Sequence, residues 1–327
     1  MNKKKILFIS KGAHAASTRY RALVYFNILE TNGWHPVHMT ARHNLLSRMR
    51  LLHRALSADV VVVLRKTFGN PFLRLLRICS KHLIFDLDDA IFCNSNGSVS
   101  RRRENRFAQI ARNCQQVWAG NLYLNEIAGR HNGSVITLPT SLTIDKYIVD
   151  TKKPDDHIDL VWIGSGSTQR YLEEALPILE RLADRLPCLR LKIVADFDLP
   201  SQRLNTLAVR WSENRESKQL SSAHIGIAPM PDNAWTRGKC GLKVLQYMAA
   251  GLPVVSSPSG VNGKIVEHGV NGFLAEGLEE WQVAIGKLAP DPDLRKMMGE
   301  TGRRTVVEHY SVEETCCKML EALEALS

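Results

Sequence analysis

The sequence lacks the features that mark several protein classes. None of its hydrophobic runs approaches the roughly 20 residues that a membrane-spanning helix needs. Its seven cysteines are an odd number and no two are spaced as CxxC, so neither a zinc site nor a disulfide framework is indicated, which fits a reducing compartment. The N-terminal MNKKKILFIS joins basic residues to a short apolar run, but Lys11 interrupts that run and no A-x-A-like site follows. We therefore expect no secretory signal and a cytoplasmic protein.

Acidic residues are scarce in the first part of the chain. Residues 1–140 contain 21 Lys and Arg but 7 Asp and Glu, a net charge of +14 (21 − 7). Residues 141–327 contain 22 Lys and Arg and 26 Asp and Glu, a net charge of −4 (22 − 26). The overall composition, 44% hydrophobic and 23% charged, excludes a disordered or collagen-like chain. At about 100–200 residues per domain, the length suggests two domains, and the uneven charge suggests that they divide the work.

Short apolar runs recur along the chain, with helical patterns between them. Continuous β-branched runs are typical of buried parallel strands, and their alternation with helices indicates βαβ units. The expected fold class is therefore α/β, with two Rossmann-like doubly wound domains facing a cleft. The runs lie at 5–10, 35–40, 59–64, 82–89, 116–120 and 134–139 in the first half, and at 159–165, 189–196, 224–230, 253–258 and 271–276 in the second.

A polar stretch separates the two series of runs. Residues 140–159 have a Lys-Lys-Pro-Asp-Asp core, and we interpret them as the linker. Residues 311–326 carry apolar positions at helical spacing and should form a helix that closes the fold. The prediction is a first domain over residues 1–142, a second over 143–310 and a C-terminal helix over 311–327.

The densest chemical signal is the segment RGKCGLKVLQYMAAGLPVVSSPSGVNGKIVEHGVNGFLA, residues 237–275. It predicts a glycine-rich turn, a helix over about 241–250, a glycine stop at Gly251 and a buried strand, followed by a second glycine turn, a short helix and a further strand. The cations Arg237, Lys239 and Lys243 surround the start of the first helix. Free backbone N–H groups and the helix dipole favour a phosphate there, and the lysines add charge. A solvated basic turn is the alternative that this segment alone leaves open.

The same segment resembles the donor-binding core of the family 4 (group 1) retaining glycosyltransferases, which have the two-domain GT-B fold. Their pattern runs E-G-F-G-L-P-x-L-E-A-M-A-x-G-x-P-V-V, followed by G-G-x-x-E-I-V-x-x-G-x-N-G, and the alignment needs no gaps. Strand order, linker position and closing helix agree more loosely over nearly the whole chain. The matching residues are Gly241, Leu242, Leu245, Met248, Ala249, Gly251, Pro253, Val254, Val255, Gly260, Ile265, Val266, Gly269, Asn271 and Gly272.

The resemblance implies a hexosyltransferase-type enzyme that moves a sugar from a nucleoside-diphosphate sugar to a hydroxyl of a glycan or lipid-linked acceptor, as in polysaccharide biosynthesis. It also implies retention of the anomeric configuration and no metal or other cofactor. Residues 1–142 would bind the acceptor and residues 143–310 the donor. On this basis we expect a transferase, with no metal-binding residue among the site candidates.

This chain departs from the family pattern, because the usual pair of glutamates is missing. The aligned residues are Gly238 and Gln246. In the family the first glutamate contacts the donor sugar and the second the ribose. An amide such as that of Gln246 can still hydrogen-bond a ribose hydroxyl, whereas glycine offers no sugar contact, for which Asp232 is our candidate.

The family's cationic clamp on the diphosphate is also altered. The stretch GSGSTQRYL, residues 164–172, holds only Arg170 where the family carries an Arg and a Lys, and Lys243 replaces the family's proline. Lys239 and Lys243 are therefore our candidates for catalytic stabilisation of the departing diphosphate. The donor-binding candidates are Gly164, Ser165, Ser167, Asp232, Arg237, Gly241, Leu242 and Gln246.

Two segments of the first half supply candidates for the acceptor side. In KGAHAASTRYRAL, residues 11–23, we expect Ser17 or Thr18 to cap a helix. The resemblance implies that the matching loop lies against the donor phosphate and the acceptor; solvated arginines are the alternative. FDLDDAIF, residues 85–92, ends a strand with three aspartates, and strand ends face the ligand crevice in such sheets. The cleft candidates are His14, Arg19 and Arg21, and Asp88 and Asp89 are expected to bind or orient the acceptor hydroxyl as catalytic residues.

The basic surface of the first half suggests a partner. Residues 45–56 and 71–82 are amphipathic with cationic faces, and RRRENR at 101–106 is a charge run. Basic amphipathic helices can bind anionic lipid, so we expect an anionic membrane surface or a lipid-linked acceptor, and a peripheral position on the inner face of the cell membrane. The alternative is that their apolar faces pack on the sheet and their charges are only solvated. No nucleic acid is expected, because no stacking aromatics interleave the basic runs. The alternatives left open are a non-catalytic nucleotide-sugar or glycan-binding subunit, and another GT-B enzyme such as a sugar-nucleotide epimerase.

Overall fold

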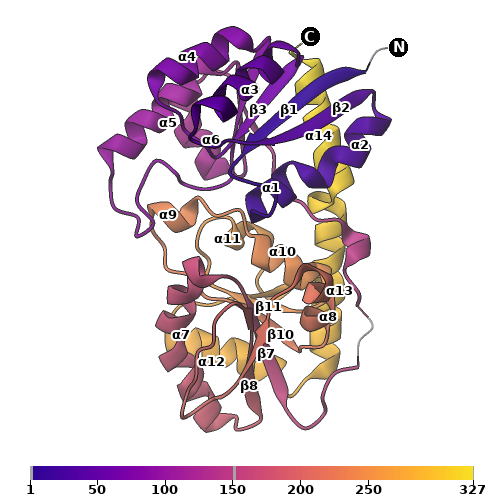
Figure 1. Cartoon of the computed structure of the whole chain (residues 1–327). Helices are drawn as coiled ribbons and strands as arrows, with labels where there is room; N and C mark the ends of the chain where they lie inside the picture. The colour runs from indigo at the N-terminus through magenta and orange to yellow at the C-terminus, as the bar shows by residue number, and fades with distance from the viewer. Residues whose placement is uncertain (1–2, 150–151, 327) are drawn as a thin grey trace. The chain divides into compact units, whose positions relative to one another are not determined.

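The computed structural model of the chain describes residues 3–149 and 152–326 and divides into two compact units (Figure 1). The first unit comprises the chain up to Ser141, the segment Asn233–Cys240 and the chain from Val312 onward. The second comprises Leu142–Asp232 and Gly241–Ser311. Within the described residues each unit holds one parallel sheet of six strands, which confirms the α/β class with two doubly wound domains. The segment Asn233–Cys240, which we expected in the second domain, packs with the first.

The sheet of the first unit has the order β2-β1-β3-β4-β5-β6, and each neighbouring pair is parallel. The third strand, VVVVL, is buried along its whole length, as a central strand covered on both faces requires. The strands are β1 Lys4–Ser10, β2 Trp34–Thr40, β3 Val60–Leu64, β4 His82–Leu87, β5 Gln116–Ala119 and β6 Val135–Thr137.

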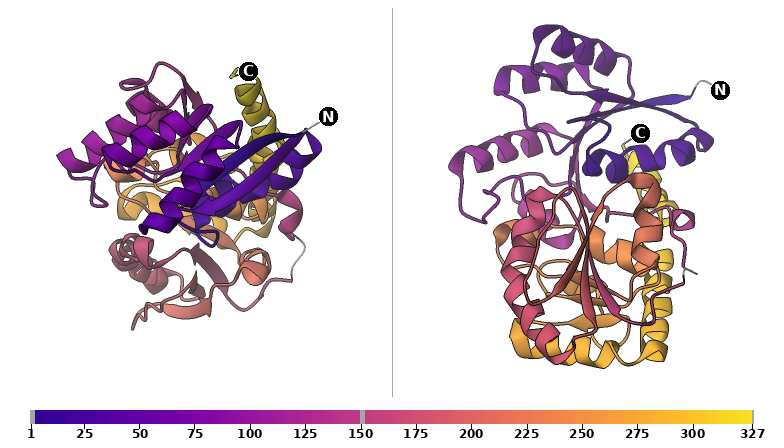
Figure 2. Two further views of the ribbon diagram at one scale, coloured as in Figure 1. Left: turned by 45° about the horizontal axis from the view of Figure 1, so that its top comes forward. Right: turned by 60° about the horizontal axis from the view of Figure 1, so that its bottom comes forward.

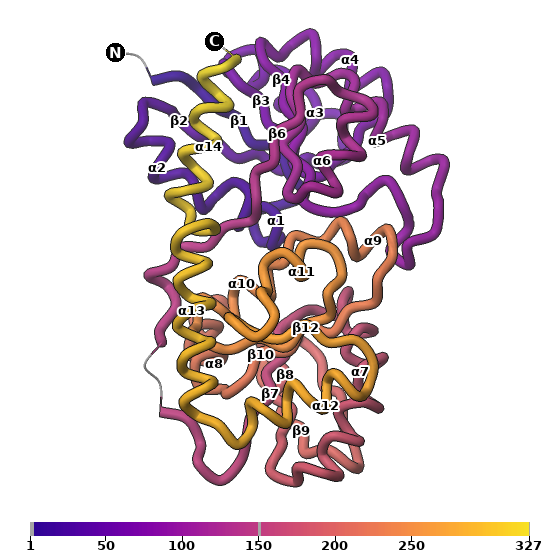
Figure 3. The backbone as a smooth tube through the Cα atoms, turned by 180° about the vertical axis from the view of Figure 1, so that it is seen from behind, coloured from indigo at the N-terminus to yellow at the C-terminus, as the bar shows by residue number. Residues whose placement is uncertain are grey.

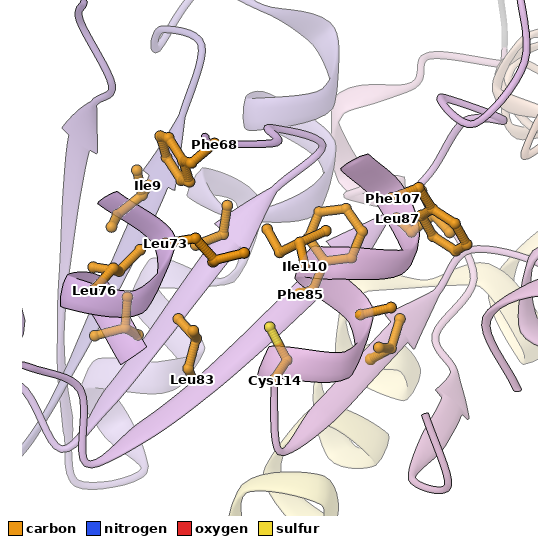
Figure 4. Close-up of a cluster of buried hydrophobic side chains, with 14 of the residues drawn as sticks. Ile9, Phe68, Leu73, Leu76, Leu83, Phe85, Leu87, Phe107, Ile110 and Cys114 are labelled. Carbon is orange, nitrogen blue, oxygen red and sulfur yellow. The ribbon is translucent and has the colours of Figure 1, made fainter. Parts of the chain in front are cut away.

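Helices cover both faces of this sheet because successive side chains of a strand point to opposite faces. Leu7 packs into one core cluster and Phe8 into the other. Figure 4 shows the first cluster, to which α3 to α6 contribute; α1, η1, α2 and α14 cover the second (Figure 3 shows α14 beside α2). The helices are α1 Ala16–Arg21, η1 Leu23–Tyr25, α2 Phe26–Thr31, α3 Leu45–Leu56, α4 Asn70–Cys79, α5 Arg101–Asn113, α6 Leu122–Gly129, α9 Ala234–Arg237 and α14 Val312–Glu324.

The sheet of the second unit has the order β12-β11-β10-β7-β8-β9, again parallel throughout. The sequence did not predict β9, because this edge strand has only a three-residue apolar run at 207–209 and none of its residues is buried. The strands are β7 Ile158–Ile163, β8 Leu189–Ala195, β9 Asn205–Arg210, β10 Ile225–Ala228, β11 Val254–Ser256 and β12 Gly272–Leu274.

Helices also flank the second sheet on both sides (Figure 2). Leu160 and Trp162 of β7 pack with α7 and α12 in one core cluster, and the alternating residues face the other side. Among the described residues, no helix combines the length and hydropathy that crossing a bilayer requires. The helices are η2 Ile144–Lys146, α7 Gly166–Arg185, α8 Glu213–Ser221, α10 Leu242–Ala249, α11 Asn262–Ile265, α12 Gly277–Leu288 and α13 Pro292–Tyr310.

The strand orders place a topological switch point in each sheet. In the first, the chain leaves β1 toward β2 on one side and leaves β3 toward β4 on the other. In the second, the chain leaves β7 toward β8 and leaves β10 toward β11 in the opposite direction. Ligands of open α/β sheets bind outside the carboxyl ends of the strands at such a point. The residues that follow β1 and β3, and those that follow β7 and β10, are therefore where a functional site is expected.

The predicted linker, residues 140–159, is held to the second unit over its first half. Tyr147 donates its hydroxyl to Glu216 Oε1 at 2.9 Å, and the backbone N–H of Ile148 donates to Ser217 Oγ at 2.7 Å. Strand β7 already begins at Ile158, and residues 150 and 151 lie outside the described residues. On the other side of the division between the units, Ser141 Oγ lies 2.7 Å from the hydroxyl of Tyr25. The polar stretch therefore includes the boundary between the two units, but its first half is hydrogen-bonded to the second unit.

Candidate functional site

The turn after β7 forms one side of the switch point in the second unit. Ser165 is the N-cap of α7, and Thr168 Oγ1 accepts from its backbone N–H at 3.5 Å. Gly164 has no room for a side chain, because a Cβ there would overlap the ring of Trp162. Ser165, Gly166 and Ser167 are exposed. The first turn of this long helix therefore presents backbone N–H groups and the positive end of its dipole to solvent.

Lys243 brings a cation to this turn from α10, on the other side of the same switch point. Its ammonium lies 3.2 Å from Thr168 Oγ1 and 3.6 Å from the ring centroid of Trp162. Gly241, the N-cap of α10, has φ 69°, and a Cβ at this position would meet Ile265 and Val261. Only glycine adopts this left-handed conformation readily, so the glycine is needed where α10 starts. A lysine beside the N-terminus of a helix is an arrangement that favours a bound anion.

Gln246, the expected ribose contact, belongs to a buried hydrogen-bond network. Its side chain is 4% exposed, and Nε2 donates to Glu216 Oε1 at 2.7 Å. Glu216 also accepts from the hydroxyl of Tyr147 and, at Oε2, from Trp211 Nε1 at 2.8 Å. The carboxylate thus has three neutral donors, which is how a buried charge is made tolerable. Gln246 therefore ties α10 to α8 and to the linker.

In the first unit, the carboxylates after β4 form a compact cluster with Arg65, which follows β3. Arg65 Nη2 lies 2.7 Å from Asp89 Oδ2, and its Nε lies 3.1 Å from Asp88 Oδ1. The backbone of Arg65 has φ 49°, and within residues 3–149 and 152–326 this is the one non-glycine residue with positive φ. Such a conformation costs on the order of 1–3 kcal/mol and is retained where the surroundings impose it. The strained backbone of Arg65 therefore lies beside the switch point of the first sheet, where the surrounding residues hold it in place.

The segment Asn233–Cys240 completes this cluster. Lys239 Nζ lies 3.1 Å from both oxygens of Asp89, and Cys240 Sγ donates to the carbonyl of Asp88 at 3.3 Å. Asn121 donates to the carbonyl oxygens of Arg237 and Lys239 at 3.1 and 2.9 Å. A Cβ at Gly238 would overlap Ala90, so the position that holds a glutamate in the family pattern has no room for one here. The glycine is therefore required for the segment to pack on the first unit.

The charges in this cluster act on each other strongly because they are little exposed to solvent. Burial raises the pKa of Asp89, while Lys239 and Arg65 oppose that shift. The carboxylate of Asp88 raises the pKa of Arg65. Two cations facing two carboxylates make the cluster close to neutral overall. Among the residues described by the structure, no group of three or more His, Cys, Asp or Glu side chains is placed to hold a metal ion.

Arg21 is not available to a ligand in the way that we expected. Its side chain is 2% exposed, with Nε and Nη2 at 3.1 and 2.6 Å from the two oxygens of Asp86 and Nη1 donating to the carbonyl of Leu138 at 2.6 Å. Burial lowers the pKa of Arg21, but Asp86 outweighs that effect, so the guanidinium stays charged. Arg21 lies on the inward side of α1, where its guanidinium links Asp86 of β4 to Leu138, which follows β6.

The other predicted residues of the β1–α1 segment lie nearer the surface. Ala15 is the N-cap of α1, so the prediction of a Ser17 or Thr18 cap was wrong; Thr18 donates to Ser10 Oγ at 2.7 Å instead. Arg19 lies over the ring of Tyr20, with 5.2 Å from its guanidinium carbon to the centroid. His14 is exposed in the turn itself. Arg19 and His14 thus remain near the switch point of the first sheet.

The predicted site residues therefore fall into two groups. The second unit contains Gly164, Ser165, Ser167, Asp232, Gly241, Leu242, Lys243 and Gln246, and the first contains His14, Arg19, Arg21, Asp88, Asp89, Arg237 and Lys239. Arg237 and Asp232 are both exposed. Sequence reasoning missed Arg65, Asn121 and Glu216. Arg65 directly follows a predicted strand, so the rule that located the aspartates would have found it; Glu216 lies in a polar helix that carries no such signal.

The region around Lys243 is similar to known proteins. Residues 148–291 match the family model described as "Glycosyl transferases group 1". The chain is 30% identical over 123 residues to a D-inositol 3-phosphate glycosyltransferase of Corynebacterium urealyticum, an alignment that covers 36% of this chain and 28% of that protein. The chain thus aligns with little more than a quarter of this curated relative.

Two solved structures align with almost the whole chain. Sucrose-phosphate synthase of Thermosynechococcus elongatus aligns with 99% of this chain and 99% of its own, with a TM-score of 0.77 and 13% identity. The Anabaena protein HepE, in complex with UDP and glucose, aligns with 98% of this chain and 100% of its own, with a TM-score of 0.73 and 15% identity. At this level of identity the likeness establishes the fold. The chain has the two-domain GT-B fold, and the region that forms most of its second unit is similar to the group 1 glycosyl transferases.

Proposed function

We propose that the protein is a glycosyltransferase that moves a sugar from a nucleoside-diphosphate sugar to a hydroxyl of a glycan or lipid-linked acceptor. The observation that carries this proposal is the ammonium of Lys243, 3.2 Å from Thr168 Oγ1, at the exposed start of α7 and at the switch point of the second sheet. A diphosphate seated there would meet a cation, backbone N–H groups and a helix dipole together. The family match over residues 148–291 and the UDP and glucose bound by HepE support this choice of ligand.

The chemistry that fits these groups is displacement of the nucleoside diphosphate. The bond between the anomeric carbon and the diphosphate oxygen breaks as the acceptor oxygen bonds to that carbon, and the leaving diphosphate takes the acceptor's proton on the same face of the sugar. Retention, as in family 4, follows from this attack on the face that the diphosphate leaves. Independence from metal follows if Lys243 and the N–H groups of α7 neutralise the charge on the leaving diphosphate.

The donor side is assigned to the second unit. Gly164 and Ser165 shape the turn, since their own N–H groups donate to Val194 and Thr168, and Ser167 supplies a backbone N–H group, as do Gly241 and Leu242 where α10 starts. Gln246 is assigned to the ribose as one of a pair with Glu216, which holds its amide in place. Asp232, which is exposed, is assigned to the hydroxyls of the donor sugar.

The acceptor side is assigned to the first unit. Asp88 and Asp89 bind and orient the acceptor hydroxyl, and Arg65 and Lys239 hold the two carboxylates in position. Lys239 therefore acts on Asp89 rather than on the diphosphate. The location that we propose is the cytoplasm, because all seven cysteines are free, the form they take in a reducing compartment.

Thermal unfolding in the presence of a panel of nucleoside diphosphates tests the donor side. A ligand at 100 times its Kd stabilises the native state by about 2.7 kcal/mol, which is readily measured. We expect the nucleoside diphosphate of one base to raise the unfolding temperature of the wild type but not that of Lys243→Ala. Lys296 is an exposed lysine of α13, and Lys296→Ala should respond as the wild type does. No shift with any nucleoside diphosphate would contradict the proposal.

A non-catalytic nucleotide-sugar-binding subunit is the second candidate. It is favoured by the absence of a carboxylate at Gly238 and Gln246, the positions of the family's two glutamates. It predicts that the donor binds and is neither transferred nor slowly hydrolysed. Another GT-B enzyme, such as an epimerase, predicts an altered sugar nucleotide and no new glycosidic bond. Analysis of the products therefore separates the three.

A further inference from the structure

Helices α3 and α4 expose an apolar surface that packing within the first unit does not use. Both helices bury one side in the same core cluster, through residues such as Leu51 and Leu76. Their outward sides carry large apolar side chains; Leu46 is 71% and Ile78 is 78% exposed. We call these residues the outer apolar surface: Leu45, Leu46, Met49 and Leu56 of α3 and Leu75 and Ile78 of α4.

The two helices lie side by side, so these residues form one surface rather than scattered positions. Their connections run β2–α3–β3 and β3–α4–β4 across neighbouring strands, and the two helices contact each other. Arg48 of α3 lies over the ring of Phe72 of α4, with 5.3 Å from its guanidinium carbon to the centroid. Contiguous exposed apolar surface on a soluble domain marks a site of interaction.

The outer apolar surface is surrounded by cations. Residues 41–81 contain nine Lys and Arg and a single acidic residue, Asp59, which lies 3.6 Å from Lys81. Arg50 and Arg54 of α3 and Arg74 of α4 are exposed. Long arginine side chains can lie along an apolar surface while their guanidinium groups reach outward.

Helix α5, which contacts α4 on the same face of the sheet, extends the basic region. It begins with RRRENR, and its four arginines there are all exposed. The N-terminal end of a helix carries a partial positive charge, so cations in its first turn are unfavourable unless an anion lies nearby. Glu104 is the acidic residue of that turn. The start of α5 is thus a place where binding of anions relieves repulsion.

We infer that the outer apolar surface and its arginines dock on an anionic lipid bilayer. The aliphatic side chains would insert among the acyl chains of such a membrane, and the arginines around them would bind its phosphate headgroups. Single-stranded nucleic acid would require exposed aromatic rings for stacking, whereas Phe72, the aromatic residue of α4, is buried. The surface is independent of the donor site, so the inference goes beyond the proposed glycosyl transfer.

The docking surface reaches the edge of the sheet that carries the acceptor carboxylates. Leu45 begins α3 directly after the carboxyl end of β2, and Asp88 and Asp89 follow the carboxyl end of β4 in the same parallel sheet. A bilayer held against α3 would therefore present a lipid-linked hydroxyl on that side of the unit. This last step rests on the proposed function; the docking itself does not.

Co-sedimentation with vesicles tests the inference. The full chain is mixed at about 0.15 M salt with vesicles of phosphatidylcholine, or of phosphatidylcholine and phosphatidylglycerol in equal parts. We expect binding to the mixed vesicles and little to the neutral ones. Leu46→Ser combined with Ile78→Ser should weaken binding at least tenfold, and Arg50→Glu combined with Arg54→Glu should do the same, since each arginine near the surface contributes about fivefold.

Matched controls come from exposed residues of the second unit. Val283→Ser with Met297→Ser removes comparable apolar area, and Arg215→Glu with Arg304→Glu makes the same change of charge. Both controls should bind mixed vesicles as the wild type does, and every variant should keep its thermal unfolding and its response to nucleoside diphosphate. If nucleoside diphosphate failed to stabilise the protein, that result would count against the proposed donor site only. Membrane docking would still be tested by the sedimentation results.

Five results would overturn the inference. Four of them are equal binding to neutral and anionic vesicles, binding to neither, equal losses in the controls and the surface variants, and concentration-dependent dimerisation that the Leu46→Ser and Ile78→Ser pair abolishes. Complete displacement from vesicles by DNA without any effect of the Leu46→Ser and Ile78→Ser pair would also overturn it, because it would show a polyanion site without an apolar component.

Discussion

Lys239 and Asp89 are 150 positions apart in the chain, and the ammonium of Lys239 lies 3.1 Å from both oxygens of the Asp89 carboxylate. The pair lies within the first unit, because Asn233–Cys240 packs there rather than with the helix α10 that follows it. A motif that resembles a donor-binding core along the sequence is therefore divided. Its first residues contact Asp88 and Asp89, the proposed acceptor carboxylates, and its later residues, from Gly241 on, surround the proposed diphosphate site.

The pH dependence of activity should report on the Lys239–Asp89 pair. Burial raises the pKa of Asp89, and Lys239 opposes that shift, so Lys239→Ala raises this pKa further. Activity that needs the carboxylate is present above the pKa and is lost as the pH falls through it. The acid limb of the kcat/KM profile should therefore move to higher pH in Lys239→Ala. A profile that falls in height with an unchanged acid limb would assign Lys239 to another role.

Two substitutions of Arg65 separate the effect of its backbone strain on stability from the effect of its guanidinium on acceptor binding. At φ 49°, Arg65→Gly removes the guanidinium and relieves the backbone, whereas Arg65→Ala removes the guanidinium and keeps the strain. The alanine variant should therefore be less stable than the glycine variant by about 1 kcal/mol in urea unfolding. Both should raise the KM for the acceptor, because Asp88 and Asp89 lose the same partner. Equal stability of the two variants, or unchanged KM in both, would refute this assignment.

Restoring the family's glutamate at position 246 should destabilise the protein. Gln246→Glu would place a second carboxylate at hydrogen-bond distance from Glu216 in a buried network, at a cost on the order of 2 kcal/mol. The reciprocal pair Gln246→Glu with Glu216→Gln restores one amide and one carboxylate and should recover part of that loss. Urea unfolding of the three variants measures it. A stable single variant with unchanged nucleotide binding would show that the network is unimportant.

His224 should make stability depend on pH in weakly acidic solution. Its Nδ1 accepts from the backbone N–H of Asp159 at 2.9 Å, and burial lowers the pKa of His224 from 6.5 to about 4. The unfolded chain binds this proton more readily, so the stabilisation is complete above pH 6.5 and is lost as the pH falls toward about 4. His224→Gln should flatten the fall in the urea midpoint across that window. An equally steep fall in the variant would contradict this explanation.

The sequence predicted the class of the fold, eleven of the strands that the structure describes and the helix over 242–249, because long apolar runs and glycine turns are local signals. It missed β9 because the apolar run of this edge strand, residues 207–209, is short and lies between polar residues. The path of Asn233–Cys240 was not predicted, because it depends on non-local contacts with Asn121 and Asp89.

The site followed the same division. The positions of Asp88, Asp89 and Lys243 were predictable because they follow a strand or begin a helix, and their roles stay predictions. The inward orientation of Arg21 depends on Asp86, 65 positions away. Glu216 could not be found, because its importance comes from three hydrogen-bond donors on other segments. From the sequence alone, a glutamate in a polar helix is interpreted as exposed to solvent, and only its neighbours in the structure show that it is buried.

The most direct test of the account is the rate at which nucleoside diphosphate and a new glycoside form together from the matching sugar nucleotide and an acceptor. The account predicts equal amounts of both products with the donor's anomeric configuration. It also predicts that kcat falls on the order of 10²–10³-fold in Lys243→Ala, while Lys296→Ala keeps the wild-type rate. Full activity of Lys243→Ala with the confirmed donor, or tight donor binding with no product in the wild type, would contradict it.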